Sequence, residues 1–133
     1  MKKLAPGTEI DGFLVEDCIH AGGMAHIYSV RYAQAQRPAT APSFPMVMKI
    51  PRMTAGDGAE NIVSFEVELQ ILPVLQGPHV PRFVAAGDLI RLPYLVMEHI
   101  AGQTLQHWLD QPQPLPIATI CQLGAAMAQA VHS

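Results

Sequence analysis

Charged residues are scarce in this sequence. They make up 14% of its 133 residues, against roughly 25% in an average soluble domain, while 50% of the residues are hydrophobic. The formal net charge is −3, so the chain lacks the basic stripe that binds nucleic acid, and we expect no nucleic-acid partner. A small apolar domain and a piece of a larger core would both show this composition, which does not decide between them.

The sequence also lacks segments that would direct it to a membrane. Lys2 and Lys3 are followed by Leu-Ala-Pro-Gly rather than by the hydrophobic core of a signal peptide. The longest apolar stretch, residues 117–131, is interrupted by a threonine and two glutamines and is shorter than the roughly 20 residues of a membrane span. We therefore expect no membrane segment in this chain and a cytoplasmic location.

Cysteine is rare, and metal-binding patterns are missing. The two cysteines, Cys18 and Cys121, lie far apart, and we expect two buried free thiols in a reducing cytosol rather than a disulfide or a zinc site. The six histidines show neither an H-E-x-x-H motif nor another paired spacing. We expect no metal site in the chain.

Short apolar runs predict three strands in the first part of the chain. Residues 9–31 hold two such runs on either side of a Gly-Gly pair, which predicts two strands joined by a tight turn. Residues 34–45 contain three prolines, which donate no ladder hydrogen bond, and predict an exposed loop. Residues 46–50 predict a strand that contains Lys49, whose side chain needs a partner because an unpaired buried ammonium is costly.

A helix is predicted to follow the Gly-Asp-Gly turn at residues 56–58, with Asp57 and Glu60 at capping-box spacing. Pro73 is expected to end or kink it. The apolar side chains that fall on one face at helical period are Ile62, Phe65, Leu69 and Leu72.

Glu68 shares this inward face, because it lies three residues after Phe65 and four before Leu72. An inward carboxylate needs a cation, and Lys49 is the one available. The alternatives are a solvated helix charge for Glu68 and an edge-strand lysine with its ammonium in solvent for Lys49.

The rest of the chain predicts two more strands and two helices. The predicted strands turn at Gly87-Asp88, and a linker rich in proline and glutamine separates the helices. The last helix is apolar on most faces, as in the middle of a domain, and little of the chain is left to cover it. The strands are expected at residues 80–85 and 92–100, and the helices at 104–109 and 117–133.

Four segments stand out by their residues and their order. They read I-H-A-G-G-M-A-H-I-Y at 19–28, M-V-M-K at 46–49, F-E-V-E-L-Q-I-L at 65–72 and L-P-Y-L-V-M-E-H-I-A-G-Q-T-L at 92–105. Singly they predict little more than a hairpin turn, a strand, a helix and a buried strand with a glycine turn. Together they resemble the N-terminal lobe of a bacterial-type serine/threonine protein kinase, within the protein kinase-like superfamily.

The resemblance implies that residues 19–28 form the glycine-rich loop, whose backbone amides close over the phosphates of ATP. The family pattern is G-x-G-G-M-G-x-V-Y after a leucine or isoleucine. His20 and Ala25 replace the first and third glycines, which we expect to stiffen or displace this phosphate clasp. The positions that match are Ile19, Gly22, Gly23, Met24, Ile27 and Tyr28.

The resemblance further implies that Lys49 contacts the α- and β-phosphates and pairs with Glu68, which makes these two the catalytic residues of the lobe. Val47 would lie where the family has a small alanine over the adenine.

By the same match Met97 is the gatekeeper behind the adenine. The backbone groups of Glu98 and Ile100 would form the hydrogen bonds of the hinge with the adenine.

The fold implied is α+β. Residues 1–101 would form the kinase N-terminal lobe, a five-stranded antiparallel sheet with one helix, and residues 102–133 the first two helices of the C-terminal lobe. The family's H-R-D-x-K-x-x-N and D-F-G motifs, which supply the catalytic aspartate and the Mg²⁺ ligands, do not occur in the sequence. We therefore expect a chain truncated before the catalytic loop and inactive alone. The expected cofactor is ATP, with Mg²⁺ only if the C-terminal lobe is present.

Three functions remain open. The chain is part of an active, non-specific serine/threonine protein kinase, or a pseudokinase or regulatory nucleotide- or protein-binding module, or a small independent protein that uses the lobe as an interaction surface. Lys49 and Glu68 favour the first, whereas His20, Ala25 and Val47 favour the second. The expected partners are a protein substrate or regulatory partner and the C-terminal lobe.

Overall fold

The computed structural model describes residues 4–34, 37–52 and 60–132. The chain divides into two compact units. The first comprises Met1–Gln76 with Val80–His99, and the second Gly77–His79 with Ile100–Ser133.

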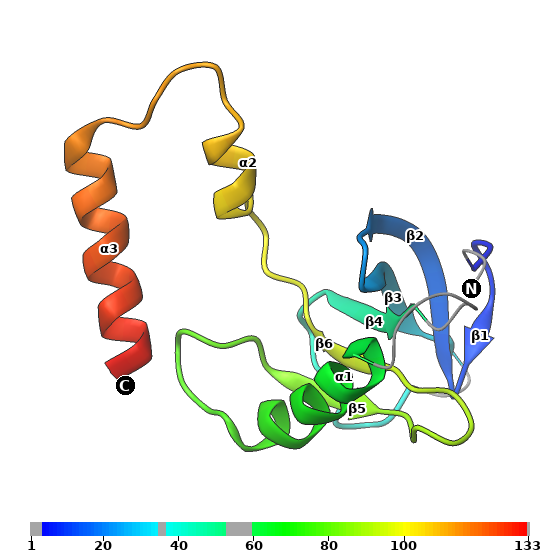
Figure 1. Cartoon of the computed structure of the whole chain (residues 1–133). Coiled ribbons are helices and arrows are strands. Elements are labelled where there is room, and N and C mark those ends of the chain that lie inside the picture. The colour runs from blue at the N-terminus through cyan, green and yellow to red at the C-terminus, as the bar shows by residue number, and fades with distance from the viewer. Residues whose placement is uncertain (1–3, 35–36, 53–59, 133) are drawn as a thin grey trace. The chain divides into compact units, whose positions relative to one another are not determined.

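Within the described residues, the first unit is built on a six-stranded sheet in which all neighbouring strands are antiparallel (Figure 1). The strand order is β1-β2-β3-β4-β6-β5. The strands are β1 Glu9–Ile10, β2 Phe13–Ala21, β3 Ala25–Tyr32, β4 Met46–Pro51, β5 Phe83–Ala86 and β6 Leu95–Glu98.

The sheet has one strand more than the five expected. β1 pairs with the start of β2, with Glu9 opposite Leu14. Asp11 and Gly12 between them have φ angles of +48° and +87°, and positive φ at both central residues is the requirement of a type I′ hairpin turn. An Asp-Gly pair is the sequence signal for such a turn, so dividing residues 9–31 into only two strands is wrong.

The strands β5 and β6 are shorter than predicted. The prediction starts β5 at residue 80 and extends β6 from residue 92 to residue 100, whereas the structure pairs only Phe83 to Ala86 with Leu95 to Met97. Pro81 and Pro93 lie in the parts that do not pair. Proline has no N–H to donate to a ladder, which explains why pairing begins after each of them.

One face of the sheet carries the main core, and we call it the filled face. Alternate residues of a strand point to the same face, and the register places Tyr28 opposite Met48 and Met48 opposite Val96. All three side chains are fully buried. The buried members of this core are Ile10, Phe13, Val15, Tyr28, Val30, Met46, Met48, Ile50, Tyr94 and Val96.

Helix α1, Glu60–Ile71, packs with β6 through Leu95, which lies on the opposite face to Val96. Phe65 and Leu72 form a second core cluster with Leu95, and Leu69 packs against it, so the predicted inward stripe is confirmed at these positions. A 3₁₀ turn, η2 Leu72–Val74, follows the helix and contains Pro73, as expected. Asp57 of the predicted capping box lies outside the described residues.

A polar cluster joins the β1–β2 turn to the loop before β6. The hydroxyl of Tyr94 donates to Oδ2 of Asp11 at 2.8 Å, and the guanidinium of Arg91 lies 3.3 Å from Oδ1 of Asp11. Burial of the phenol, followed by its hydrogen bond to Asp11 and the charge of Asp11, raises the pKa of Tyr94 to about 12. The cluster holds Asp11 in its positive-φ conformation next to the filled face.

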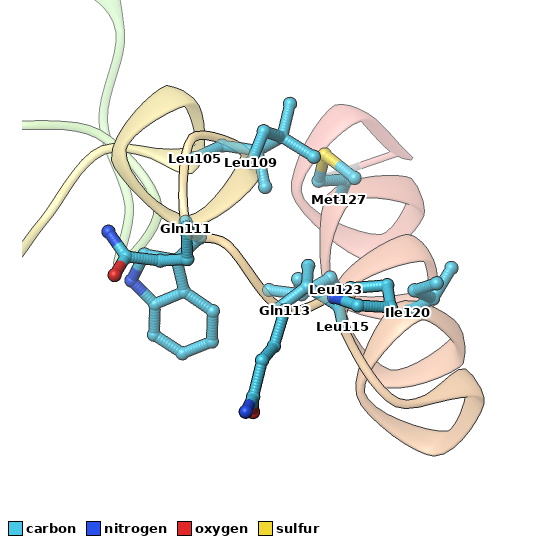
Figure 2. A pocket seen from close by; sticks show the side chains of 10 residues that line it. Leu105, Leu109, Gln111, Gln113, Leu115, Ile120, Leu123 and Met127 are labelled. Atoms are coloured by element: carbon cyan, nitrogen blue, oxygen red, sulfur yellow. The ribbon is translucent and has the colours of Figure 1, made fainter.

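The second unit contains α2, Leu105–Leu109, and α3, Ile117–His132. The hydroxyl of Thr104 caps α2 by accepting a hydrogen bond from the His107 N–H at 3.1 Å. Neither helix has a buried residue among those described. A pocket of about 480 Å³ is lined by apolar side chains of both helices and of the linker between them, including Leu105, Leu109, Leu115, Ile120, Leu123 and Met127 (Figure 2).

The two cysteines are free, as expected, but they are not buried. Cys18 is half-buried at a register shift in β2, and Cys121 is exposed on α3. The expectation of two buried thiols is therefore wrong, because a place in an apolar helix does not by itself bury a side chain. Among the described residues, no helix combines the length and the apolar character that crossing a membrane requires.

Candidate functional site

Lys49 on β4 and Glu68 on α1 form an ion pair. The ammonium donates to both carboxylate oxygens, with Nζ 3.1 Å from Oε1 and 2.9 Å from Oε2. The side chains keep 27% and 34% of their exposure, so solvent still reaches the pair. A pair this open adds about 1 kcal/mol or less to the free energy of unfolding. Stability alone therefore gives little reason for a lysine inside a strand.

Three apolar residues that the sequence assigns to nucleotide binding share the sheet face of Lys49. Ile27 lies opposite Lys49 in the β3–β4 ladder, and Val47 lies opposite Met97 in the β4–β6 ladder. Val47 and Lys49 are two residues apart on one strand, so their side chains point the same way. Val47 is buried, while Ile27 and Met97 are half-buried. We call this side of the sheet the lysine face.

The turn between β2 and β3 holds Gly22 and Gly23. The N–H of Gly22 donates to the carbonyl of Ala25 at 3.0 Å, which closes the turn. The register of β2 shifts between Cys18 and His20, so Ile19 lies at an irregularity of the ladder and keeps 46% of its exposure.

A pocket of about 300 Å³ lies between this glycine turn and β4. Its lining combines the Lys49 ammonium with a turn whose glycines let the backbone approach a ligand closely, a combination that suits an anion. A second cavity of about 60 Å³ shares Met24, Ala25 and Lys49 with it and reaches Phe65 and Glu68 on α1. The first pocket is lined by His20, Gly22, Gly23, Met24, Ala25, Ile27 and Lys49.

Arg52, just after β4, bonds to both ends of the glycine turn. Its backbone N–H donates to the Met24 carbonyl at 2.9 Å, and its Nη1 donates to the Gly22 carbonyl at 3.3 Å. Its own carbonyl accepts from the side-chain amide of Asn61 on α1 at 3.3 Å. Sequence reasoning missed Arg52, because no motif or periodicity singles it out.

The two hinge residues are not brought to this pocket. Glu98 ends β6, where its N–H donates to the Arg82 carbonyl at 2.9 Å and its carboxylate accepts from the Arg82 N–H at 3.2 Å. Ile100 belongs to the second unit and is 58% exposed. Within the described residues, no group of three or more His, Cys, Asp or Glu side chains is arranged to hold a metal ion.

Two curated proteins are similar to the chain in sequence. One is a probable serine/threonine-protein kinase of Clostridium perfringens, 25% identical over 115 residues that cover 86% of this chain and 16% of that protein. The other is the probable serine/threonine-protein kinase YbdM of Bacillus subtilis, 24% identical over 121 residues that cover 90% and 44%. The chain therefore spans less than half the length of these relatives. No protein-family model matches it.

Solved structures agree with these sequence matches. The kinase domain of Mycobacterium tuberculosis PknI superposes with a TM-score of 0.72 and 22% identity, over 98% of this chain and 51% of that domain. The apo form of PpkA gives a TM-score of 0.62 and 16% identity, over 83% and 43%. The chain thus has the fold of part of a protein kinase domain, which confirms the predicted fold class.

Proposed function

We propose that this chain, a bacterial serine/threonine kinase-like N-terminal lobe with the helices that follow it, binds ATP as part of a protein kinase. The observation that carries the proposal is the ion pair between Lys49 and Glu68, on the same sheet face as Ile27, Val47 and Met97. A strand lysine held by a helix carboxylate is the arrangement by which kinases position the α- and β-phosphates. The ion pair adds little stability, so positioning of a ligand is the better explanation for it.

Each residue has a separate role in this proposal. Lys49 binds the α- and β-phosphates, and Glu68 fixes the position of its ammonium. Gly22 and Gly23 let the backbone of the turn approach the phosphates.

The adenine side of the site is apolar. Ile19, Ile27 and Val47 cover the adenine, and Met97 closes the pocket behind it. The backbone of Glu98 binds the adenine edge, together with that of Ile100, whose role rests on the sequence match alone.

In the longer protein, the γ-phosphoryl group moves from the β-phosphate oxygen of ATP to a serine or threonine hydroxyl of a protein substrate. Residues 1–101 would form its N-terminal lobe, and residues 102–133 would begin its C-terminal lobe. The aspartate that orients the hydroxyl and the ligands of Mg²⁺ belong to motifs that this sequence does not contain. We therefore expect no phosphoryl transfer by the 133-residue chain alone, and measurable phosphorylation of a generic protein substrate would contradict this.

One observation favours a second function, that of a pseudokinase or regulatory module. A Cβ atom on Gly22 would lie 2.8 Å from Nε2 of His20, so the imidazole rests against the glycine turn. A module of this kind would bind nucleotide weakly or not at all.

A titration of the isotope-labelled 133-residue chain with ATP, followed by NMR, tests the first function. We expect weak binding, with a dissociation constant near ~1 mM, and chemical-shift changes at Gly22, Gly23 and Lys49. Lys49→Met should abolish these changes while leaving the spectrum of a folded protein. Arg31→Met, which removes an exposed cation paired with Glu16 on the β2–β3 hairpin, should bind ATP like the wild type. Unchanged binding by Lys49→Met would rule the proposal out.

A further inference from the structure

We infer that His20 is a phosphate-binding residue of this site, with its imidazole taking over part of the task of the missing first glycine. The inference rests on the proposed function and goes beyond it, since the kinase pattern assigns no side chain to this position. It starts from the position of His20 in the sheet.

An irregularity in β2 turns His20 toward the lysine face. Cys18 is paired with Tyr28, whose side chain belongs to the filled face, while His20 is paired with Ile27, whose side chain belongs to the lysine face. In a regular strand, residues 18 and 20 would point to the same face. The register shift between them places them on opposite faces. His20, Ile27 and Lys49 therefore follow one another across three strands on one face.

The imidazole lies at the glycine turn, inside the anion-sized pocket. The position a Cβ of Gly22 would take is 2.8 Å from Nε2 and 3.4 Å from Cδ2 of His20, so the ring edge contacts Gly22. His20 also lines the pocket of about 300 Å³ together with Lys49. The side chain is exposed at its outer end, which leaves it room to adjust to a ligand.

The charges around the ring favour an anion. Lys49 faces the pocket from β4, and the carboxylate of Glu68 on α1 is already held by the Lys49 ammonium. The guanidinium of Arg52 bonds to the Gly22 carbonyl on the other side of the turn. An imidazole N–H, and more strongly an imidazolium, donates a charge-assisted hydrogen bond to a phosphate oxygen. The triphosphate chain of ATP carries the negative charge that this surface lacks.

The same geometry allows an opposite outcome, in which the ring occupies the phosphate position and hinders binding. The two differ in sign when the family's glycine is restored. If His20 binds phosphate, His20→Gly weakens ATP binding. If the ring only fills the space beside Gly22, His20→Gly strengthens it.

We would measure ATP and adenosine binding by NMR titration for the wild type, His20→Gly and His20→Ala. His79→Gly, which changes an exposed histidine outside the pocket, is the matched control. We expect both His20 variants to bind ATP about 5- to 10-fold more weakly, the loss of one hydrogen bond to a charged group, and to bind adenosine unchanged. Using two substitutions guards against a variant that fails to fold, which its spectrum would show.

A pH series adds a readout that a purely structural role would not move. Between about pH 6 and pH 8 the wild type should lose ATP affinity relative to His20→Gly, because an imidazolium is the better donor. Both proteins meet the same change in the protonation of ATP, so only their difference counts. Equal or tighter ATP binding by the His20 variants, beside ATP binding by the wild type that Lys49→Met abolishes, overturns this inference alone. Absence of ATP binding by the wild type overturns the proposed function with it.

Discussion

The filled face and the lysine face of the same sheet solve different problems. On the filled face, side chains from β2, β3, β4 and β6 pack into one closed core. On the lysine face, the core is smaller, formed by Phe65, Leu72 and Leu95, and beside it lie the ion pair and the pocket.

Met48 and Lys49 show the difference most directly, because they are neighbours on β4. Met48 is fully buried among apolar side chains, whereas 27% of the Lys49 side chain is exposed next to a carboxylate. A strand offers its two faces to alternate residues. One strand can therefore anchor the core with one side and present a charge with the other.

Substitutions at these two positions should separate stability from binding. Met48→Ala is expected to lower the free energy of unfolding by about 2–5 kcal/mol, because it leaves a cavity in the filled face. Lys49→Met is expected to change it by less than about 1 kcal/mol, since Glu68 keeps its contact with solvent. Urea unfolding followed by circular dichroism measures both. Equal destabilisation by the two changes would show that the faces are not independent.

A smaller effect is expected at the polar edge of the filled face. Tyr94→Phe removes the hydrogen bond to Asp11 and should lower the free energy of unfolding by about 1 kcal/mol at neutral pH. Asp11→Asn keeps an acceptor at the same place and should cost less. If both variants are as stable as the wild type, the cluster does not fasten the β1–β2 turn.

The same hydroxyl gives a pH dependence of defined sign. The pKa of Tyr94 is about 12 in the folded chain against 10.0 for an ordinary tyrosine, so between these values the unfolded chain has lost a proton that the folded chain keeps. Stability falls as pH rises wherever the folded state binds more protons. The contribution of Tyr94 is therefore complete below about pH 10 and is lost as pH approaches about 12. The stability difference between wild type and Tyr94→Phe should shrink across this window, and a constant difference would contradict the shift.

How far the sequence predicted this site follows from which signals are local. Lys49 and Glu68 could be paired because one interrupts an apolar strand and the other shares an apolar helix stripe. Both signals lie within a few residues of the side chain itself. The extra strand β1 also had a local signal, Asp11-Gly12, which the prediction passed over.

Other features depend on how strands align with one another, which periodicity along one strand does not encode. The register shift that turns His20 toward Lys49 is a property of β2 and β3 together. The hydrogen bonds of Arg52 to the glycine turn likewise need the β3–β4 ladder, which sets Ala25 opposite Pro51. The kinase pattern could locate the glycine loop, but not the contacts that hold it in this chain.

The smallest expected effect concerns these contacts. Arg52→Met removes the bond from Nη1 to the Gly22 carbonyl but keeps the backbone bond to Met24. We expect less than about 0.5 kcal/mol of global destabilisation and faster amide exchange at Gly22, whose N–H closes the turn onto Ala25. The amides of β4 should exchange as before, because local opening of a turn needs less free energy than unfolding of a core strand.

Arg31→Met is the control, since Arg31 lies at the other end of the same hairpin and pairs only with the exposed Glu16 among the described residues. It should leave Gly22 exchange unchanged. If Arg52→Met also leaves it unchanged, the turn is held by its backbone bonds alone. The lysine face would then resemble the filled face in owing its shape to the ladder, and the guanidinium would have no part in it. Faster exchange confined to Gly22 would instead show that a side chain outside every kinase motif sets the stiffness of the phosphate clasp.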